Sequence, residues 1–170
     1  PRYADICGIT EDELKSTFGE SVEELARANE LSVDDCYKKL AQMYDGYHFT
    51  ENSVGIYNPF SLLNTFNSGK FRMYWFETGT PTFLVRYLKQ GNYNLDNISR
   101  NDVSLETLTG SNYVSPAPIT LMYQAGYLTI KDYDQRFNTY NLDYPNEEVK
   151  RGFMYSLSQL FAPALIDGEP

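Results

Sequence analysis

Apolar residues recur at intervals of three and four along the first fifty residues, which is the spacing of short amphipathic helices. Thr10 followed by Glu13 has the form of a capping box, and Ser32 has the position of a further helix cap. Gly19 is expected to end the first helix. Three short helices, forming a bundle, are therefore predicted here. Their inward-facing positions are Ile9, Leu14 and Phe18 in the first, Val22, Leu25, Ala26 and Asn29 in the second, and Val33, Cys36, Tyr37, Leu40, Met43 and Tyr44 in the third.

Two more helices are predicted in the aromatic middle of the chain. Gly46 suits a turn with positive φ after the third helix, and Ile56-Tyr57 suits a short strand. Asn58-Pro59 begins the fourth helix and Gly69 ends it, while Thr80-Pro81 begins the fifth. The predicted apolar faces are Phe60, Leu63 and Phe66 in the fourth helix, and Phe83, Leu84, Tyr87 and Leu88 in the fifth.

The last third of the chain has the clearest pattern. Pro118 suits the start of a helix, and Gly126 suits the position just past its end. Two β-rich runs then flank residues 134–136, a connection of hairpin length, and Asn146 caps a final helix with two Glu residues in its first turn. A helix, a two-stranded wing and a helix in this order form a winged-helix layout. The inward-facing positions are Leu128 and Ile130, Tyr140 and Leu142, and Val149, Phe153, Leu157, Leu160 and Phe161.

The predicted fold class is therefore mainly α with a small β-hairpin. The helical bundle occupies residues 1–91, a connecting segment residues 92–115, and the winged-helix-like subdomain residues 116–170. The connecting segment is rich in Asn and Ser. Its Val103, Leu105 and Leu108 allow a helical turn or two without defining one.

Composition limits the classes of protein that the chain can belong to. With 42% hydrophobic and 15% aromatic residues it can bury a real interior, and its net charge of −9 disfavours a general nucleic-acid surface. No apolar run has the roughly 18 residues of a membrane helix. Cys7 and Cys36 both lie on apolar-patterned stretches, so both are predicted to be buried free thiols, which fits a reducing cytoplasm. The start at Pro1 suggests a piece of a longer soluble protein.

Several strings of unusual sequence, in the same order, resemble a bacterial family of predicted AAA-ATPase-like proteins, whose members commonly carry a PD-(D/E)XK nuclease domain further on. The resemblance covers nearly the whole chain except residues 92–115. The strings are Arg2–Gly8, Tyr44–Phe49, Tyr57–Asn64, Tyr74–Pro81, Met122–Tyr133 and Pro145–Val149.

The resemblance implies that this chain is the segment that follows the nucleotide-binding core. Residues 1–91 would then form a helical lid-like subdomain, since AAA-type proteins carry a small helical lid over the nucleotide. The expected partners are the missing N-terminal P-loop domain and a C-terminal nuclease domain of the same chain. ATP and Mg are expected cofactors of that parent protein, in the cytoplasm, and none is expected in this segment.

The chemistry expected of an ATPase or nuclease is missing from the sequence itself. Gly69-Lys70 is followed by Phe71, whereas a phosphate-binding loop needs Ser or Thr there, and no apolar strand ends in an acidic pair. The two Glu-x-Lys triplets, Glu13–Lys15 and Glu148–Lys150, have nuclease spacing but lie in predicted helices, so solvated helix faces explain them better. No catalytic residue is predicted, and this segment is not expected to be an enzyme.

Four residues remain as candidate contacts to nucleotide or to a neighbouring domain: Asp45, Tyr47, His48 and Trp75. His48 is the only histidine, so a Ser-His-Asp or Cys-His site would have to use it, and no other string points at it. His48 is more simply a partly buried turn residue, and Trp75 more simply a core residue than a stacking platform. Two cysteines and one histidine are too few for a zinc site made of those ligands alone, and no metal site is predicted.

Three functions stay open. The first is regulation of nucleotide binding, or relay of nucleotide state to an attached domain, by a non-catalytic segment of an AAA-like ATPase. The second is DNA binding by the winged-helix unit, which is disfavoured because residues 113–161 carry four cations against five carboxylates. The third is carbohydrate binding, which requires Trp75 and Tyr47 to be exposed and coplanar on one surface; burial is expected instead.

Overall fold

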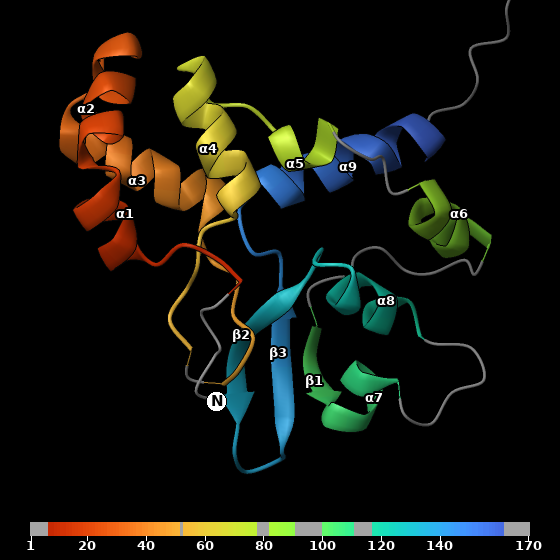
Figure 1. The fold of residues 1–170 in the computed structure, drawn as a ribbon. Helices are drawn as coiled ribbons and strands as arrows, with labels where there is room; N and C mark the ends of the chain where they lie inside the picture. Colours follow the sequence, from red (N-terminus) through yellow and green to blue (C-terminus); the bar gives the residue numbers. More distant parts are fainter. Residues whose placement is uncertain (1–6, 52, 78–81, 91–99, 111–116, 162–170) are drawn as a thin grey trace, which may run out of the picture.

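The computed structural model describes residues 7–51, 53–77, 82–90, 100–110 and 117–161. In these ranges the chain is mainly helical and contains a small three-stranded antiparallel sheet (Figure 1). The helices are α1 (Glu11–Thr17), α2 (Gly19–Ala28), α3 (Val33–Tyr44), α4 (Pro59–Ser68), α5 (Tyr74–Glu77), α6 (Thr82–Gln90), α7 (Leu105–Thr109), α8 (Pro118–Gln124) and α9 (Glu147–Phe161). The strands are β1 (Arg100–Ser104), β2 (Thr129–Asp134) and β3 (Thr139–Asp143).

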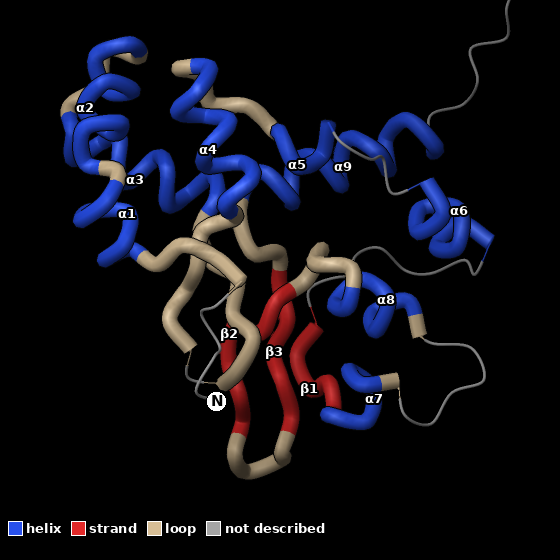
Figure 2. The backbone as a smooth tube through the Cα atoms, viewed as in Figure 1, coloured by secondary structure: helices blue, strands red, loops and turns tan. Residues whose placement is uncertain are grey.

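The helices and the sheet are segregated in space (Figure 2). Helices α1 to α5 and α9 lie together above the sheet as drawn, while α7 and α8 flank the sheet beside β1 (Figure 1). Helix α9 contacts α3, α5 and α6. No helix in the described ranges is both long and apolar enough to cross a bilayer.

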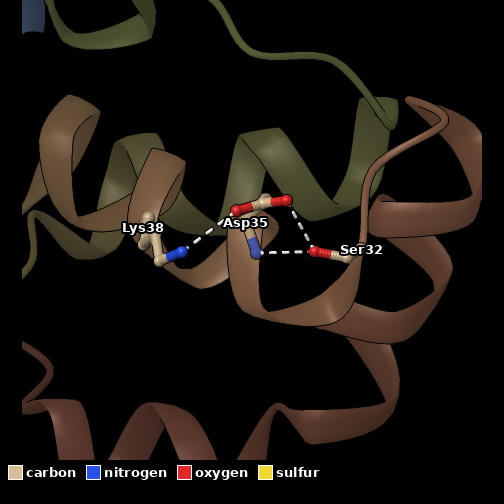
Figure 3. A network of polar contacts seen from close by, with 3 residues as sticks. All are labelled: Ser32, Asp35 and Lys38. Carbon is tan, nitrogen blue, oxygen red and sulfur yellow. Dashed lines mark hydrogen bonds and ion pairs between the residues drawn. The ribbon is translucent and has the colours of Figure 1, made fainter.

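The predicted helix caps at Thr10 and Ser32 are confirmed. Thr10 and Glu13 form a full capping box at the start of α1, with each side chain bonded to the backbone of the other residue. At α3, Ser32 Oγ accepts a hydrogen bond from the amide of Asp35 at 3.1 Å and donates to its carboxylate at 2.7 Å (Figure 3). Lys38 binds the other carboxylate oxygen at 3.1 Å, and these contacts lower the pKa of Asp35. Local sequence therefore fixes where these helices begin.

Gly19 was expected to end the first helix, but it does not lie at that end. It is the first residue of α2, which follows α1 after the single residue Phe18. Phe18 ends one helix and precedes the other, and its ring stacks on Phe66 of α4 with 5.7 Å between centroids. The packing of an aromatic ring, rather than a glycine stop, thus sets the bend between α1 and α2.

The first of two hydrophobic clusters fills the space among α1, α2, α3 and α4. The predicted face of α4 is right for Phe66, which packs against this cluster, and wrong for Phe60 and Leu63, which are about half exposed. Ser61, Leu62 and Thr65 are buried instead. Leu62 packs into this cluster, and that choice turns Ser61 toward α9. The buried apolar residues of the cluster are Leu14, Val22, Leu25, Ala26, Cys36, Leu40, Tyr44, Tyr57 and Leu62.

The prediction for the two cysteines is half right. Both thiols are free, and Cys36 is buried in the first cluster as expected. Cys7 is exposed, so the prediction of a buried thiol is wrong for this residue. Two residues later, the backbone of Ile9 pairs with that of Tyr57 just before α1 begins.

The predicted hairpin of β2 and β3 is present, and the sheet has a third strand that the sequence did not indicate. Strand β1 comes from the connecting segment and pairs antiparallel with β3, which gives the order β1-β3-β2. Its register shifts between Arg100 and Val103, and Asp102 in this bulge has φ +75°. Ser104 then caps α7 directly. Val103 is thus a buried strand residue rather than part of a helical turn.

The second hydrophobic cluster lies between the sheet and helices α6 to α9. The predicted inward positions of the hairpin, Leu128, Ile130, Tyr140 and Leu142, are all buried in it. Helix α6 contributes Leu84, Val85 and Leu88 to this cluster rather than to the first. The division into residues 1–91, 92–115 and 116–170 stays a prediction. The side chains of Leu160 and Phe161, and residues 80–81, 91 and 116, lie outside the described residues.

Candidate functional site

One carboxylate is buried where the two hydrophobic clusters meet. Asn146 caps α9, because its side-chain oxygen accepts a hydrogen bond from the amide of Val149 at 3.1 Å. Glu148 therefore lies in the first turn of this helix. The Glu148 side chain is 0% exposed, although Lys150 two residues on is exposed. The prediction that Glu148–Lys150 is a solvated helix face is therefore wrong for Glu148. It is right for Glu13 and Lys15, which are exposed on α1.

The Glu148 carboxylate joins three helices. Its Oε2 accepts a hydrogen bond from the Ser61 hydroxyl of α4 at 2.7 Å, and its Oε1 accepts one from the Trp75 amide of α5 at 2.9 Å. The Trp75 amide lies in the first turn of a helix, where backbone N–H groups have no partner within the helix. Glu148 therefore caps α5 from a distant part of the chain, and α4, α5 and α9 converge on one group.

The surroundings of Glu148 favour its protonated form. Burial raises the pKa of Glu148 to about 6, and the negative charge of Glu77 acts in the same direction, while the bonds from Ser61 and Trp75 oppose the change. Two phenols lie close enough to interact with its charge. Burial raises the pKa of Tyr44 to about 12 and raises that of Tyr47 further, so both stay protonated at neutral pH.

Two of the four predicted site residues, Tyr47 and Trp75, line the same cavity of about 290 Å³. A Cβ built on Gly126 would lie 3.8 Å from the Tyr47 ring and 4.0 Å from the Trp75 ring, so both rings border the same glycine. Both side chains are partly buried and pack against the second cluster. The Trp75 ring also contacts Tyr127, with 5.3 Å between centroids. They form a wall of the interior more than an open platform.

The other two predicted residues lie elsewhere. His48 binds the Ser53 carbonyl through Nδ1 at 2.8 Å, and its backbone N–H donates to the Thr129 hydroxyl at 2.7 Å. It thus has the role of a partly buried turn residue that fastens its loop to β2. Asp45 ends α3 and faces the space beside Gly55, and burial raises the pKa of its carboxyl. The structure brings Tyr47 and Trp75 together at one cavity, and neither Asp45 nor His48 is among the residues that line it.

Sequence reasoning missed Ser61 and Glu148, although one signal could have pointed to the second. Glu148, Gly152 and Ser156 repeat at intervals of four on α9, beside the apolar row of Val149 and its successors. All three are buried. A row of a charged, a small and a hydroxyl residue at helical spacing indicates close helix packing around a polar group. Ser61 gives no such signal, because its partner is 87 residues away in sequence.

The arrangement can hold and release a proton and can position helices. In the described part of the chain, no group of three or more His, Cys, Asp and Glu side chains is arranged to hold a metal ion. The hydroxyl of Ser61 donates to Glu148, but that pair is buried away from solvent. The chemistry that it supports directly is therefore a protonation-dependent contact between α4, α5 and α9.

Comparison with known proteins gives one informative similarity. No family model and no solved structure matches the chain. The chain is 36% identical over 168 residues to a protein of Azotobacter chroococcum mcd 1 described as "Uncharacterized protein in vnfD 5'region". The alignment covers 95% of this chain but 30% of that protein. The chain thus corresponds in length to less than a third of the relative that it matches.

Proposed function

We propose that the chain is a non-catalytic regulatory segment of a longer AAA-like ATPase, in which it relays the state of the nucleotide to an attached domain. The observation that carries the proposal is the buried Glu148 carboxylate, which holds α4, α5 and α9 together where the two clusters meet. A buried polar contact of this kind has few alternative arrangements, and it suits a joint between two discrete states.

The order of elements in the second half supports a winged-helix unit in this segment. A winged helix has a helix, an edge strand, two helices and a hairpin whose second strand pairs with the edge strand. Helix α6, strand β1, helices α7 and α8, and strands β2 and β3 follow that order, and the sheet order is β1-β3-β2. Helices α1 to α4 form the compact bundle that we assign to the lid.

The length of the relative supports the view that other domains share the chain. Because the matched region makes up 30% of that protein, there is room in such a sequence for a P-loop domain and a nuclease domain. In this proposal ATP and Mg bind to the P-loop domain of the parent protein. The segment described here supplies a packed, movable surface against it, in the cytoplasm.

DNA binding is a second candidate, because winged helices often place a helix in the major groove. The order of elements favours it, whereas α8, the helix before the wing, has no Lys or Arg between Pro118 and Gln124. Ile119, Thr120 and Met122 of that helix are buried. Phosphate contacts require clustered cations, so relay of nucleotide state is the better proposal.

The test compares two acidic residues of the same helical turn in the full-length parent protein. Glu148→Gln should slow ATP turnover at least about fivefold, because it removes the charge at the joint and one of its two acceptors. Glu147→Gln should leave turnover unchanged, because the Glu147 side chain reaches solvent and, among the described residues, forms its ion pair with Arg151 of the same helix at 2.8 Å. Equal turnover in both variants would remove the joint from the mechanism.

A titration separates the relay from direct nucleotide binding by this segment. The isolated chain should bind ATP no better than in the millimolar range, since its sequence has no phosphate-binding loop. Binding of ATP in the micromolar range, with nuclear magnetic resonance shifts at residues such as Tyr47 and Trp75 in the same titration, would contradict a purely non-catalytic role.

A further inference from the structure

A second cavity, which Glu148 does not line, lies between the loop after α3 and the sheet. Its volume is about 510 Å³, which is in the range of small-molecule sites. Phe49, Tyr123 and Tyr140 contribute aromatic rings to its walls, and Leu108 and Ile130 contribute aliphatic surface. We call it the ring cleft. Phe49 is 50% exposed, so the cleft opens to solvent on the side of the loop.

The ring cleft holds one carboxylate in a fixed position. The Tyr140 hydroxyl of β3 donates a 2.7 Å hydrogen bond to Glu51 Oε1, across 89 residues of sequence. This bond raises the pKa of Tyr140 to about 12, so the phenol remains the donor over the physiological range. The loop itself is fastened on both sides of Glu51, through His48 to Thr129 and through Ser53 to His48. Glu51 is thus a positioned charge on a short loop.

Nothing described in the cleft neutralises this charge. The lining residues include no Lys, Arg or His, and Glu51 forms no ion pair within the part of the chain that the structure describes. Aromatic faces attract cations through their quadrupole, and a carboxylate beside them adds a direct charge. Three rings, one acid and no base therefore complement a positive group attached to an apolar body.

We infer that the ring cleft binds a small organic cation, an alkylammonium compound whose apolar body packs on Leu108 and Ile130 while its charge lies between Glu51 and the rings. Phosphorylated and carboxylate ligands are disfavoured, because they would approach Glu51 without any cation to offset the repulsion. This inference concerns a different surface from the proposed relay and does not depend on it.

The experiment uses three probes with one apolar body: 4-phenylbutylammonium, 4-phenylbutan-1-ol and 5-phenylpentanoate. Each is titrated against the chain, and amide shifts of Phe49, Glu51 and Leu108 report occupancy. The ammonium probe should bind at least about tenfold more tightly than the alcohol, and the carboxylate should bind most weakly. Equal affinities, the reverse order, or shifts elsewhere with none in the cleft would overturn the inference.

A charge-neutral variant tests whether Glu51 is the cause. Glu51→Gln removes the charge but keeps an oxygen that can accept the Tyr140 bond. It should therefore weaken ammonium binding, leaving only the part of the preference that the rings supply, and leave alcohol binding unchanged. Glu24→Gln is the matched control, because Glu24 carries the same charge at an exposed position of α2, a helix that lies well apart from the sheet and from α7 and α8 (Figure 1). If both variants weaken ammonium binding equally, net charge rather than the cleft attracts the probe, and the inference fails.

Discussion

At the scale of single residues, Glu148 is a carboxylate whose side chain is 0% exposed, an environment unlike that of a free acid in water. Burying a carboxylate is unfavourable unless hydrogen bonds compensate for the lost hydration. Here two donors, Ser61 and Trp75, come from helices that are separate in sequence. The acid therefore specifies how these helices meet, and its energetic contribution depends on pH.

The pH dependence of stability has a definite sign. Because the folded pKa of Glu148 is raised to about 6 from an ordinary 4.5, the folded state holds this proton more tightly than the unfolded state does. The stabilisation of the folded state by protonated Glu148 is fully present below about pH 4.5 and is lost as the pH rises through 6. The loss attributable to Glu148 should be about 1–2 kcal/mol in the free energy of unfolding.

Urea unfolding of the wild type and of Glu148→Gln from pH 4 to pH 7 isolates this effect. The wild type should become less stable relative to the variant as pH rises, because Gln does not titrate. Other carboxylates, including Asp35 and Asp45, are present in both proteins and cancel in the difference. A difference that is constant with pH would show that Glu148 titrates with an ordinary pKa in the folded state.

Residue roles that depend on near neighbours were predictable, and those that depend on tertiary contacts were not. Thr10, Ser32 and Asn146 cap their helices through residues within four positions, so a short sequence window contains both partners. Glu148 looked like any other acid of a first turn. Its burial depends on which face of α4 turns inward, and Ser61 is exposed or buried according to that choice.

At the scale of elements, the contact between α5 and α9 depends on a glycine. A Cβ at Gly152 would lie 2.3 Å from two ring carbons of Phe76. Helical Gly is unfavourable by about 1 kcal/mol relative to Ala, so its presence inside α9 needs a packing reason. The Phe76 ring rests directly on the helix backbone at this position, which brings the Trp75 amide within reach of Glu148.

Gly152→Ala should lower the free energy of unfolding by about 1–3 kcal/mol, because the overpacking exceeds the gain in helix propensity. Thermal and urea unfolding measure the change. Gly19→Ala is the matched control, since Gly19 is also helical and has nothing within 4 Å of an added Cβ. It should be neutral or stabilising by up to about 1 kcal/mol. Equal effects of the two substitutions would contradict the close contact with Phe76.

Elements with strong local signals were predicted, and the one strand without them was missed. Helix α8 and the hairpin follow from Pro118, Gly126 and the alternation of buried residues. Strand β1 has the sequence RNDVS, with a single apolar residue, a bulge and Asp102 at positive φ. It is a strand because β3 offers it a partner, and that pairing is not local.

At the scale of the whole molecule, the two hydrophobic clusters are joined at several points. Glu148 binds α4 and α5, Thr129 binds His48, and Glu51 binds Tyr140. Each link joins the first half of the chain to the second. The described parts should therefore unfold as one cooperative unit rather than cluster by cluster.

Two core substitutions test this cooperativity. Leu40→Ala in the first cluster and Leu128→Ala in the second should each lower stability by about 2–5 kcal/mol. Trp75, the sole tryptophan, lies near the junction, so its fluorescence should change together with the helical circular dichroism signal in both variants. Leu63→Ala, on the exposed side of α4, should change stability by less than about 0.5 kcal/mol. Loss of helical signal without a change in fluorescence would show two independent units.

The pair of hydrogen bonds between Thr129 and His48 also affects how the protein behaves in concentrated solution. Strand β2 is one of the two outer strands of the sheet, and an open outer strand can pair with the backbone of other chains. The Thr129 hydroxyl both accepts from the His48 amide and donates to the His48 carbonyl, at 2.7 and 2.9 Å. Lys131 reaches the carbonyl of Gly46 on the same segment. The loop therefore lies beside the start of this strand, where it should hinder the pairing of β2 with another chain at high concentration.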